Sequence, residues 1–151
     1  MASFKTKIPE YKKLVDDFLD NSLPNPNQSP QKLTQAMFYS VMNGGKRIRP
    51  LMMFASAETL DINFHDVLPY AASIELLHSF SLIHDDLPCM DDDSMRRGQP
   101  TTHIEFGEAT ATLAADALQS LAFQNMALAK LPESKTSHLK LISMIAESIG
   151  L

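Results

Sequence analysis

Apolar residues recur every three or four positions along most of the chain, which is the spacing of amphipathic helices. Tyr11, Leu14, Val15 and Phe18 form the first such stripe, within residues 11–19. The same spacing predicts further helices over residues 31–43, 51–59, 70–87, 108–131 and 135–151. Runs of alternating β-branched and aromatic residues are scarce, so few β-strands are expected. The pattern therefore predicts an all-α fold of six or seven helices.

Prolines, glycines and polar segments mark where these helices end. The segment 21–30 holds three prolines and three asparagines, so it is predicted to be a loop. Gly44-Gly45 suits a helix end, and Pro50 suits the first turn of the next helix. Residues 91–107 form a looser polar connection, and Ser134 is the predicted cap of the last helix.

Composition narrows the class of protein. The 151 residues are 44% hydrophobic, as expected of a single globular domain spanning residues 1–151. A formal net charge of −5 gives no overall positive field, so no nucleic-acid partner is expected. No stretch approaches the ~20 apolar residues of a membrane span. The chain has one cysteine and no apolar leader, so a cytoplasmic location without an internal disulfide is expected.

An acidic cluster follows the long apolar helix directly. Asp85, Asp86 and Asp91 to Asp93 place five carboxylates within nine residues. Two carboxylates 4 Å apart repel by roughly 4 kcal/mol near a protein surface, and a hard divalent cation removes that cost. Oxygen ligands completed by substrate phosphates are typical of Mg²⁺, while an EF-hand would need a glycine that is missing here. A solvated acidic helix end is the alternative, although acids are disfavoured there.

The positions of these aspartates set a geometric condition. On a straight helix Asp85 and Asp91 would point about 120° apart, so they could not hold the same ion. Pro88 lies between them and removes a backbone donor. The sequence therefore predicts a helix bend at Pro88 that brings the two carboxylates together.

Two basic clusters accompany the acidic one. Arg96 and Arg97 each carry a planar guanidinium that can bind phosphate oxygens through two hydrogen bonds. Lys46 and Arg49 are three residues apart and would share a helix face, while Arg47 would point elsewhere. An ordinary basic turn is the alternative for this second cluster.

His78 lies seven residues, or two helical turns, before Asp85 and therefore on the same face. This alignment indicates a ligand-binding role. A core histidine with satisfied hydrogen bonds is the alternative.

Three motifs together carry a family resemblance: GGKRIRP, ELLHSFSLIHDDLPCMDDDSMRRGQPTTH and FGEATATLAADAL. From about Lys32 onward the chain resembles the N-terminal half of the trans-isoprenyl diphosphate synthases, most closely the bacterial farnesyl and geranylgeranyl diphosphate synthases. A class I terpene cyclase could share the aspartate-rich motif, but not the other two. The resemblance implies an all-α bundle around a deep cavity, in a cytoplasmic homodimer.

The resemblance also implies the chemistry and the residues that perform it. The expected substrates are isopentenyl diphosphate and an allylic diphosphate, either dimethylallyl or geranyl, which are condensed with the help of Mg²⁺. Asp85 and Asp91 would be magnesium ligands and Asp86 a supporting carboxylate. Arg96 would hold the allylic diphosphate. The isopentenyl diphosphate site would consist of Lys46, Arg49, His78 and Arg97.

Phe80 is the residue expected to limit product length. It precedes Asp85 by five residues, about 7.5 Å along a helix, where the growing tail would run. A large ring at that depth favours a C15 farnesyl product over a C20 product. If Phe80 is simply part of the core, product length stays undecided.

Members of the family are about twice as long as this chain and carry a second aspartate-rich motif in their second half. After Asp116 the present sequence has no paired carboxylates. Three hypotheses follow: a synthase segment that is catalytic with its remaining helices, a chain that binds Mg-diphosphate without turnover, and an inactive half-bundle that covers its apolar end with a second copy.

Overall fold

The computed structural model describes residues 4–130 and 135–150, which form a helical bundle with one short β-hairpin. The predicted all-α fold is thus confirmed, whereas the predicted cap Ser134 lies outside the described residues. In chain order the elements are α1 (Phe4–Ser22), α2 (Gln31–Met42), α3 (Ile48–Thr59), α4 (Phe64–Asp85), β1 (Met95–Arg96), β2 (Gln99–Pro100), α5 (Thr102–Phe106), α6 (Glu108–Leu128) and α7 (Lys135–Gly150).

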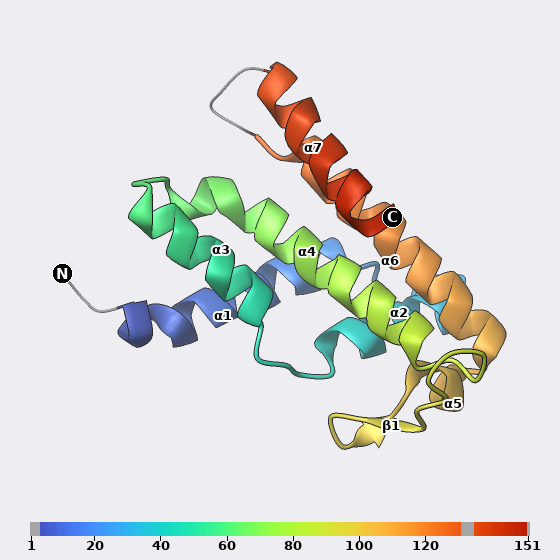
Figure 1. The fold of residues 1–151 in the computed structure, drawn as a ribbon. Helices are drawn as coiled ribbons and strands as arrows, with labels where there is room; N and C mark the ends of the chain where they lie inside the picture. Colours follow the sequence, from blue (N-terminus) through green and yellow to red (C-terminus); the bar gives the residue numbers. More distant parts are fainter. Residues whose placement is uncertain (1–3, 131–134, 151) are drawn as a thin grey trace.

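Helix α4 is the centre of the bundle, and it packs most extensively against α6 and then against α3 (Figure 1). The face of α6 that meets the core is built largely from alanine, and small side chains allow helix backbones to approach closely. Its fully buried residues are Ala111, Ala114, Ala115, Leu118, Ala122 and Met126. Leu76 of α4 and Phe54 of α3 are also fully buried. Each such large apolar side chain stabilises the fold by about 1.5–3 kcal/mol.

Helices α1 and α4 both begin earlier than predicted, and each carries a proline at its sixth position, Pro9 and Pro69. A proline removes one intrahelical hydrogen bond and crowds the preceding turn, which is why the sequence favoured later starts. In α4 packing and capping support that turn. The ring of Phe64 lies 5.5 Å from that of Tyr11, and the Asn63 side chain accepts a hydrogen bond from the His65 amide at 3.0 Å.

Helix α6 was expected to be buried and to reach residue 131, but it ends at Leu128 and only one face is covered. Leu113 is 58% exposed and Leu128 is 73% exposed. Helix α7 contacts α6, and its own Leu139 and Met144 also remain exposed. The expectation of a buried α6 is therefore wrong for its outer face.

The polar connection over residues 91–107 is more ordered than the sequence indicated. It contains the antiparallel pair β1–β2, with Met95 opposite Pro100 and Arg96 opposite Gln99, and the short helix α5. These elements lie at the end of the bundle where α4 finishes and α6 starts (Figure 1). Among the described helices, none is both long and apolar enough to cross a membrane.

Candidate active site at the end of helix α4

The acidic cluster sits where α4 ends. Asp85 is the last helical residue, and the chain then turns back over the helix end. The Asp91 amide donates to the Asp85 carbonyl at 2.8 Å, and the Asp92 amide donates to the Leu87 carbonyl at 3.1 Å. The predicted bent helix is therefore wrong: Pro88 lies in this exposed turn, and chain reversal rather than a bend brings Asp91 back towards Asp85.

Asp85 and Asp91 have carboxylates that are available to a ligand. Asp85 is half-buried and Asp91 is exposed, and neither accepts a hydrogen bond or ion pair from the described part of the chain. Within residues 4–130 and 135–150, no three acidic, histidine or cysteine side chains converge on one point as a closed metal cage would require. Mg²⁺ is usually held by one or two carboxylates, with waters and substrate phosphates completing its shell. The donor set fits that kind of open magnesium site.

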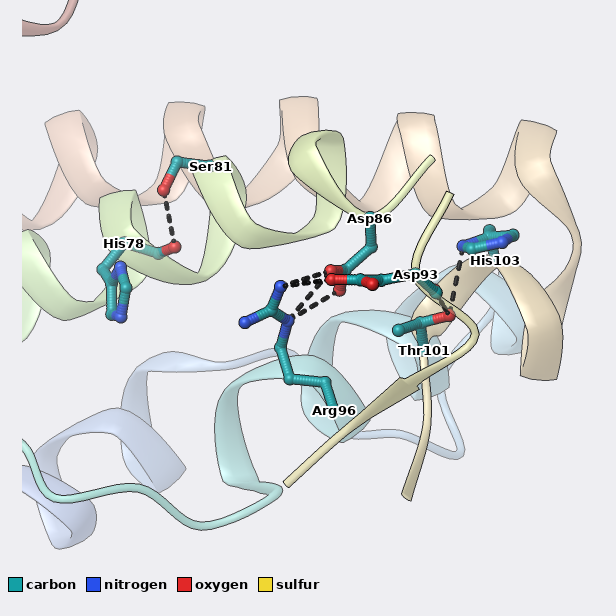
Figure 2. A network of polar contacts seen from close by, with 7 residues as sticks. All are labelled: His78, Ser81, Asp86, Asp93, Arg96, Thr101 and His103. Carbon is teal, nitrogen blue, oxygen red and sulfur yellow. Dashed lines mark hydrogen bonds and ion pairs between the residues drawn. The ribbon is translucent and has the colours of Figure 1, made fainter. Parts of the chain in front are cut away.

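Asp86 lies in different surroundings from its neighbour. It is only 3% exposed, and its two oxygens accept three hydrogen bonds from the Arg96 guanidinium at 2.6–3.0 Å (Figure 2). Asp93 lies 3.5 Å from Nη2 of the same arginine. These carboxylates raise the pKa of Arg96 and fix its orientation. The structure thus places the Asp86 carboxylate against the Arg96 guanidinium.

Arg96 keeps part of its hydrogen-bonding capacity. Its Nε and Nη2 are used by Asp86, whereas Nη1 has no partner among the residues that the structure describes. Because the Arg96 side chain is one-third exposed, Nη1 can still donate to a phosphate oxygen.

The hairpin places Arg97 against the glycine pair. Arg97 and Gly98 occupy its turn, with φ values of 54° and 81°, and positive φ at both central residues is typical of a type I′ turn. The Arg97 guanidinium donates to the Gly44 carbonyl and lies so close to Gly45 that a Cβ there would be 2.8 Å from Nη1. The sequence did not reveal this hairpin, because Arg-Gly stands where Asn-Gly or Asp-Gly would be the usual signal.

The base of the hairpin is fixed by α2. The Tyr39 hydroxyl donates to the Pro100 carbonyl at 2.8 Å, and the Tyr39 ring meets Phe106 edge-on at 5.4 Å. Sequence reasoning missed Tyr39, since a tyrosine on an amphipathic helix carries no distinguishing signal.

The four residues predicted to bind isopentenyl diphosphate line one open cavity of about 530 Å³. We call it the basic pocket; the ionisable side chains in its wall are Lys46, Arg47, Arg49, Glu75, His78 and Arg97. Burial lowers the pKa of His78, and the nearby Arg49, Arg97 and Arg96 lower it further, while Glu75 acts in the opposite direction. Burial likewise lowers the pKa of Arg97, helped by Arg47. The pocket therefore concentrates positive charge, which a phosphate group would neutralise.

Arg47 is buried, whereas Lys46 and Arg49 are exposed. Helix α3 begins at Ile48, so Lys46 precedes it and the predicted shared helix face of Lys46 and Arg49 is wrong. Arg47 is 3% exposed and pairs with Asp16 at 2.7 Å and with Glu75 at 3.1 Å. Neither acidic partner could be identified from the sequence, because both are distant along the chain.

Phe80 is half-buried on α4, and its ring packs edge-on against His84 at 4.8 Å. His84 in turn lies 3.9 Å from Asp116 of α6. The part of Phe80 in limiting product length stays a prediction.

The chain is similar to known proteins over most of its length. The family model described as Polyprenyl synthetase matches residues 30–150. Farnesyl diphosphate synthase of Haemophilus influenzae is 41% identical over 152 residues, which is 100% of this chain and 51% of that protein. Geranylgeranyl diphosphate synthase of Cyanophora paradoxa is 42% identical over 144 residues, covering 95% of this chain and 47% of that protein.

Solved structures give the same result. The FPP/GFPP synthase of Zymomonas mobilis superposes with a TM-score of 0.88 at 38% identity, covering 95% of this chain and 51% of that one. The chain thus spans about half the length of the relatives it matches. With a family model covering most of its residues, the chain belongs to the polyprenyl synthetase family.

Proposed function

We propose that this chain forms the N-terminal, substrate-binding half of an isoprenyl diphosphate synthase that condenses an allylic diphosphate with isopentenyl diphosphate to make farnesyl diphosphate. The observation that supports this most directly is the pairing of two different anion-binding places. The first has the carboxylates of Asp85 and Asp91, which are accessible to a magnesium ion, and the second is the basic pocket. The β1–β2 hairpin places Arg96 at the first and Arg97 at the second.

The proposed roles follow the surroundings of each residue. Asp85 and Asp91 would hold magnesium, which supplies charge neutralisation for the leaving diphosphate. Arg96 would donate from Nη1 to the allylic diphosphate, with Asp86 keeping its guanidinium in place. The isopentenyl diphosphate would lie in the basic pocket, bound by Lys46, Arg49, His78 and Arg97.

The reaction then needs no nucleophilic side chain. The bond between the allylic carbon and its diphosphate breaks, and the double bond of isopentenyl diphosphate supplies the electron pair for the new carbon–carbon bond. A proton leaves the adjacent carbon and is taken up by the released pyrophosphate. The chain contributes electrostatic stabilisation and orientation, and apolar side chains such as Phe80 would shield the cation from water.

Magnesium-dependent binding is the first test. Calorimetry with geranyl diphosphate and Mg²⁺ should show binding by the wild-type chain, and Asp85→Asn should weaken it by a factor of about 100. Asp92→Asn is the matched control, because Asp92 is exposed, its side chain makes no hydrogen bond or ion pair among the described residues, and it has a positive φ that asparagine tolerates. Equal affinities for both variants would contradict the metal assignment.

A product assay separates the remaining alternatives. The chain is incubated with Mg²⁺, dimethylallyl diphosphate and labelled isopentenyl diphosphate, and products are sized by chromatography. A C15 product supports the proposal, whereas a C20 product supports geranylgeranyl diphosphate synthesis, which the relative from Cyanophora paradoxa also suggests. Magnesium-dependent binding without any product would identify the chain as a binding half that needs further helices for turnover.

The same proposal includes a homodimer in the cytoplasm. The leucines exposed on α6 and α7 support association, since apolar side chains gain stability when a second copy covers them. Light scattering coupled to size exclusion would give the mass in solution directly.

A further inference from the structure

Arg47 lies between Lys46 and Arg49 in the sequence, yet its own side chain turns into the protein. Its guanidinium reaches three elements: Nε donates to Asp16 of α1 at 2.7 Å, Nη1 to Glu75 of α4 at 3.1 Å, and Nη2 to the Val41 carbonyl of α2 at 3.0 Å. Those contacts use all three nitrogens of a side chain that is only 3% exposed. Arg47 therefore ties the segment before α3 to three helices at once.

The backbone at Arg47 also needs this support. Its φ of 50° lies in the left-handed region, which is strained for a residue with a Cβ. Helix α3 begins at the next residue, and the Arg47 carbonyl accepts the Leu51 amide at 3.1 Å. The three side-chain contacts thus stabilise a strained residue. Because α3 starts directly after this residue, its conformation sets the direction of α3 and the position of Arg49.

Glu75 gives Arg47 a second effect on the basic pocket. Its carboxylate belongs to the wall of that pocket and is almost completely buried, so it would repel an entering anion if it were unpaired. The Arg47 guanidinium at 3.1 Å neutralises it. The charge of Lys46 and Arg49 is then left to act on a ligand.

We propose that Arg47 is a positioning residue for the basic pocket: through Asp16, Val41 and Glu75 it sets the loop and the first turn of α3 so that Lys46 and Arg49 face a bound diphosphate. This inference rests on the proposed function of the pocket. Although Arg47 lines the pocket, its three guanidinium nitrogens already donate to these acceptors, so it acts through Lys46 and Arg49.

Asp16→Asn tests the proposal without altering the pocket wall. Asp16 lies outside the pocket, and its side chain is 40% exposed, so the variant is expected to fold. Removing a negative charge would by itself leave anion binding unchanged or strengthen it. If Asp16 acts by anchoring Arg47, Asp16→Asn should instead weaken binding of inorganic pyrophosphate, measured by calorimetry without Mg²⁺, roughly fivefold.

Asp17→Asn is the matched control. It removes the same charge from the neighbouring position of α1, where the Asp17 carboxylate pairs on the exposed surface with Lys13 at 2.5 Å and with no other side chain among the described residues. We expect its affinity for pyrophosphate to equal that of the wild type. An Asp16→Asn variant that melts at a lower temperature but binds with wild-type affinity would show that Arg47 only stabilises the fold, and would overturn the proposal.

Arg47→Lys addresses charge and geometry separately. Lysine keeps the positive charge but has no planar fork with which to reach three acceptors, so weaker pyrophosphate binding is expected here too. Wild-type affinity in both Arg47→Lys and Asp16→Asn would refute the inference.

Lys46→Ala and Arg49→Ala test the diphosphate-binding function of the pocket separately from the positioning role of Arg47. If these variants bind pyrophosphate as tightly as the wild type, the proposed function of the pocket fails and the inference fails with it. If they bind more weakly while Asp16→Asn and Arg47→Lys do not, the pocket stands and only the inference about Arg47 is refuted.

Discussion

Asp85 and Asp86 are adjacent and chemically identical, yet their surroundings differ. The Asp85 carboxylate is half-buried and unpaired among the described residues, so it can bind an ion. The Asp86 carboxylate is buried and its oxygens are filled by Arg96. Sequence spacing indicated that both aspartates belong to one acidic cluster. It could not show which of them is paired, because the partner arginine lies on a hairpin ten residues further along.

The Asp86–Arg96 pair should contribute measurably to stability. Asp86→Ala leaves the Arg96 guanidinium without its buried partner and should lower the free energy of unfolding by about 2 kcal/mol. Asp93→Ala removes the exposed second partner and should cost less than about 1 kcal/mol. Urea denaturation followed by circular dichroism measures both. A larger loss for Asp93→Ala than for Asp86→Ala would contradict this assignment.

Gly44 and Gly45 differ in what a side chain would meet. Both have positive φ, so alanine strains the backbone at either position. At Gly45 the new Cβ would also collide with the Arg97 guanidinium, whereas at Gly44 no other atom lies within 4 Å. Gly45→Ala should therefore weaken pyrophosphate binding in the absence of Mg²⁺ roughly tenfold, which is the loss of one good charged contact.

Gly44→Ala is the control for that prediction, with an expected change of less than about twofold. Calorimetry on both variants gives the comparison. Equal losses would mean that backbone strain, not displacement of Arg97, governs the basic pocket.

His78 should make stability depend on pH. Burial and the neighbouring arginines lower its pKa below the ordinary value of 6.5, so the unfolded chain binds this proton more readily than the folded one. The contribution of neutral His78 to the free energy of unfolding is therefore fully present above pH 6.5. It is lost as the pH falls through that value and below. The free energy of unfolding should decrease between pH 7.5 and pH 5.5, and His78→Gln should reduce that decrease.

The control for this prediction is His65→Gln, because His65 is exposed on the first turn of α4. Urea titrations at pH 7.5 and pH 5.5 give, for each variant, the change in the free energy of unfolding between the two pH values. The prediction fails if His78→Gln and the wild type lose the same stability.

At the scale of elements, the contact between α4 and α6 dominates the core, and the two faces of α6 should respond differently to mutation. Leu118 is fully buried, so Leu118→Ala should cost about 2–5 kcal/mol of unfolding free energy. Leu113 is 58% exposed on the same helix, and Leu113→Ala should change stability by less than about 0.5 kcal/mol. Denaturant melts of the two variants provide the measurement, and similar costs would contradict the described packing of α6.

Periodicity predicted the helices well but not their ends. The 3.6-residue stripe identified α2 and the core of α1, because burial of one face follows directly from spacing. The first turns of α1 and α4 were not predicted. In α4 the turn before Pro69 is stabilised by the packing of Phe64 against Tyr11 rather than by local sequence preference. The hairpin was missed for the related reason that Arg97 takes a positive φ with the help of a distant contact to Gly44.

At the scale of the whole molecule, the described bundle leaves large apolar side chains exposed on α6 and α7. The chain spans about half the length of the relatives that it matches. The sequence motifs predicted that Lys46, Arg49, His78 and Arg97 share one site, and these four residues line the basic pocket. The motifs could not indicate Asp16, Glu75 or Tyr39, because the contacts of these residues join segments about 30 to 60 positions apart.

The loop that returns from Asp86 to Asp91 carries one more feature, the exposed thiol of Cys89. It is the single cysteine of the chain, so a nitroxide or a fluorophore can be attached beside the acidic cluster without any mutation. Manganese in place of magnesium would broaden the spectrum of such a spin label as the ion arrives. The molecule thus provides its own attachment point for a reporter, and ion binding can be followed spectroscopically even in a chain that turns over no substrate.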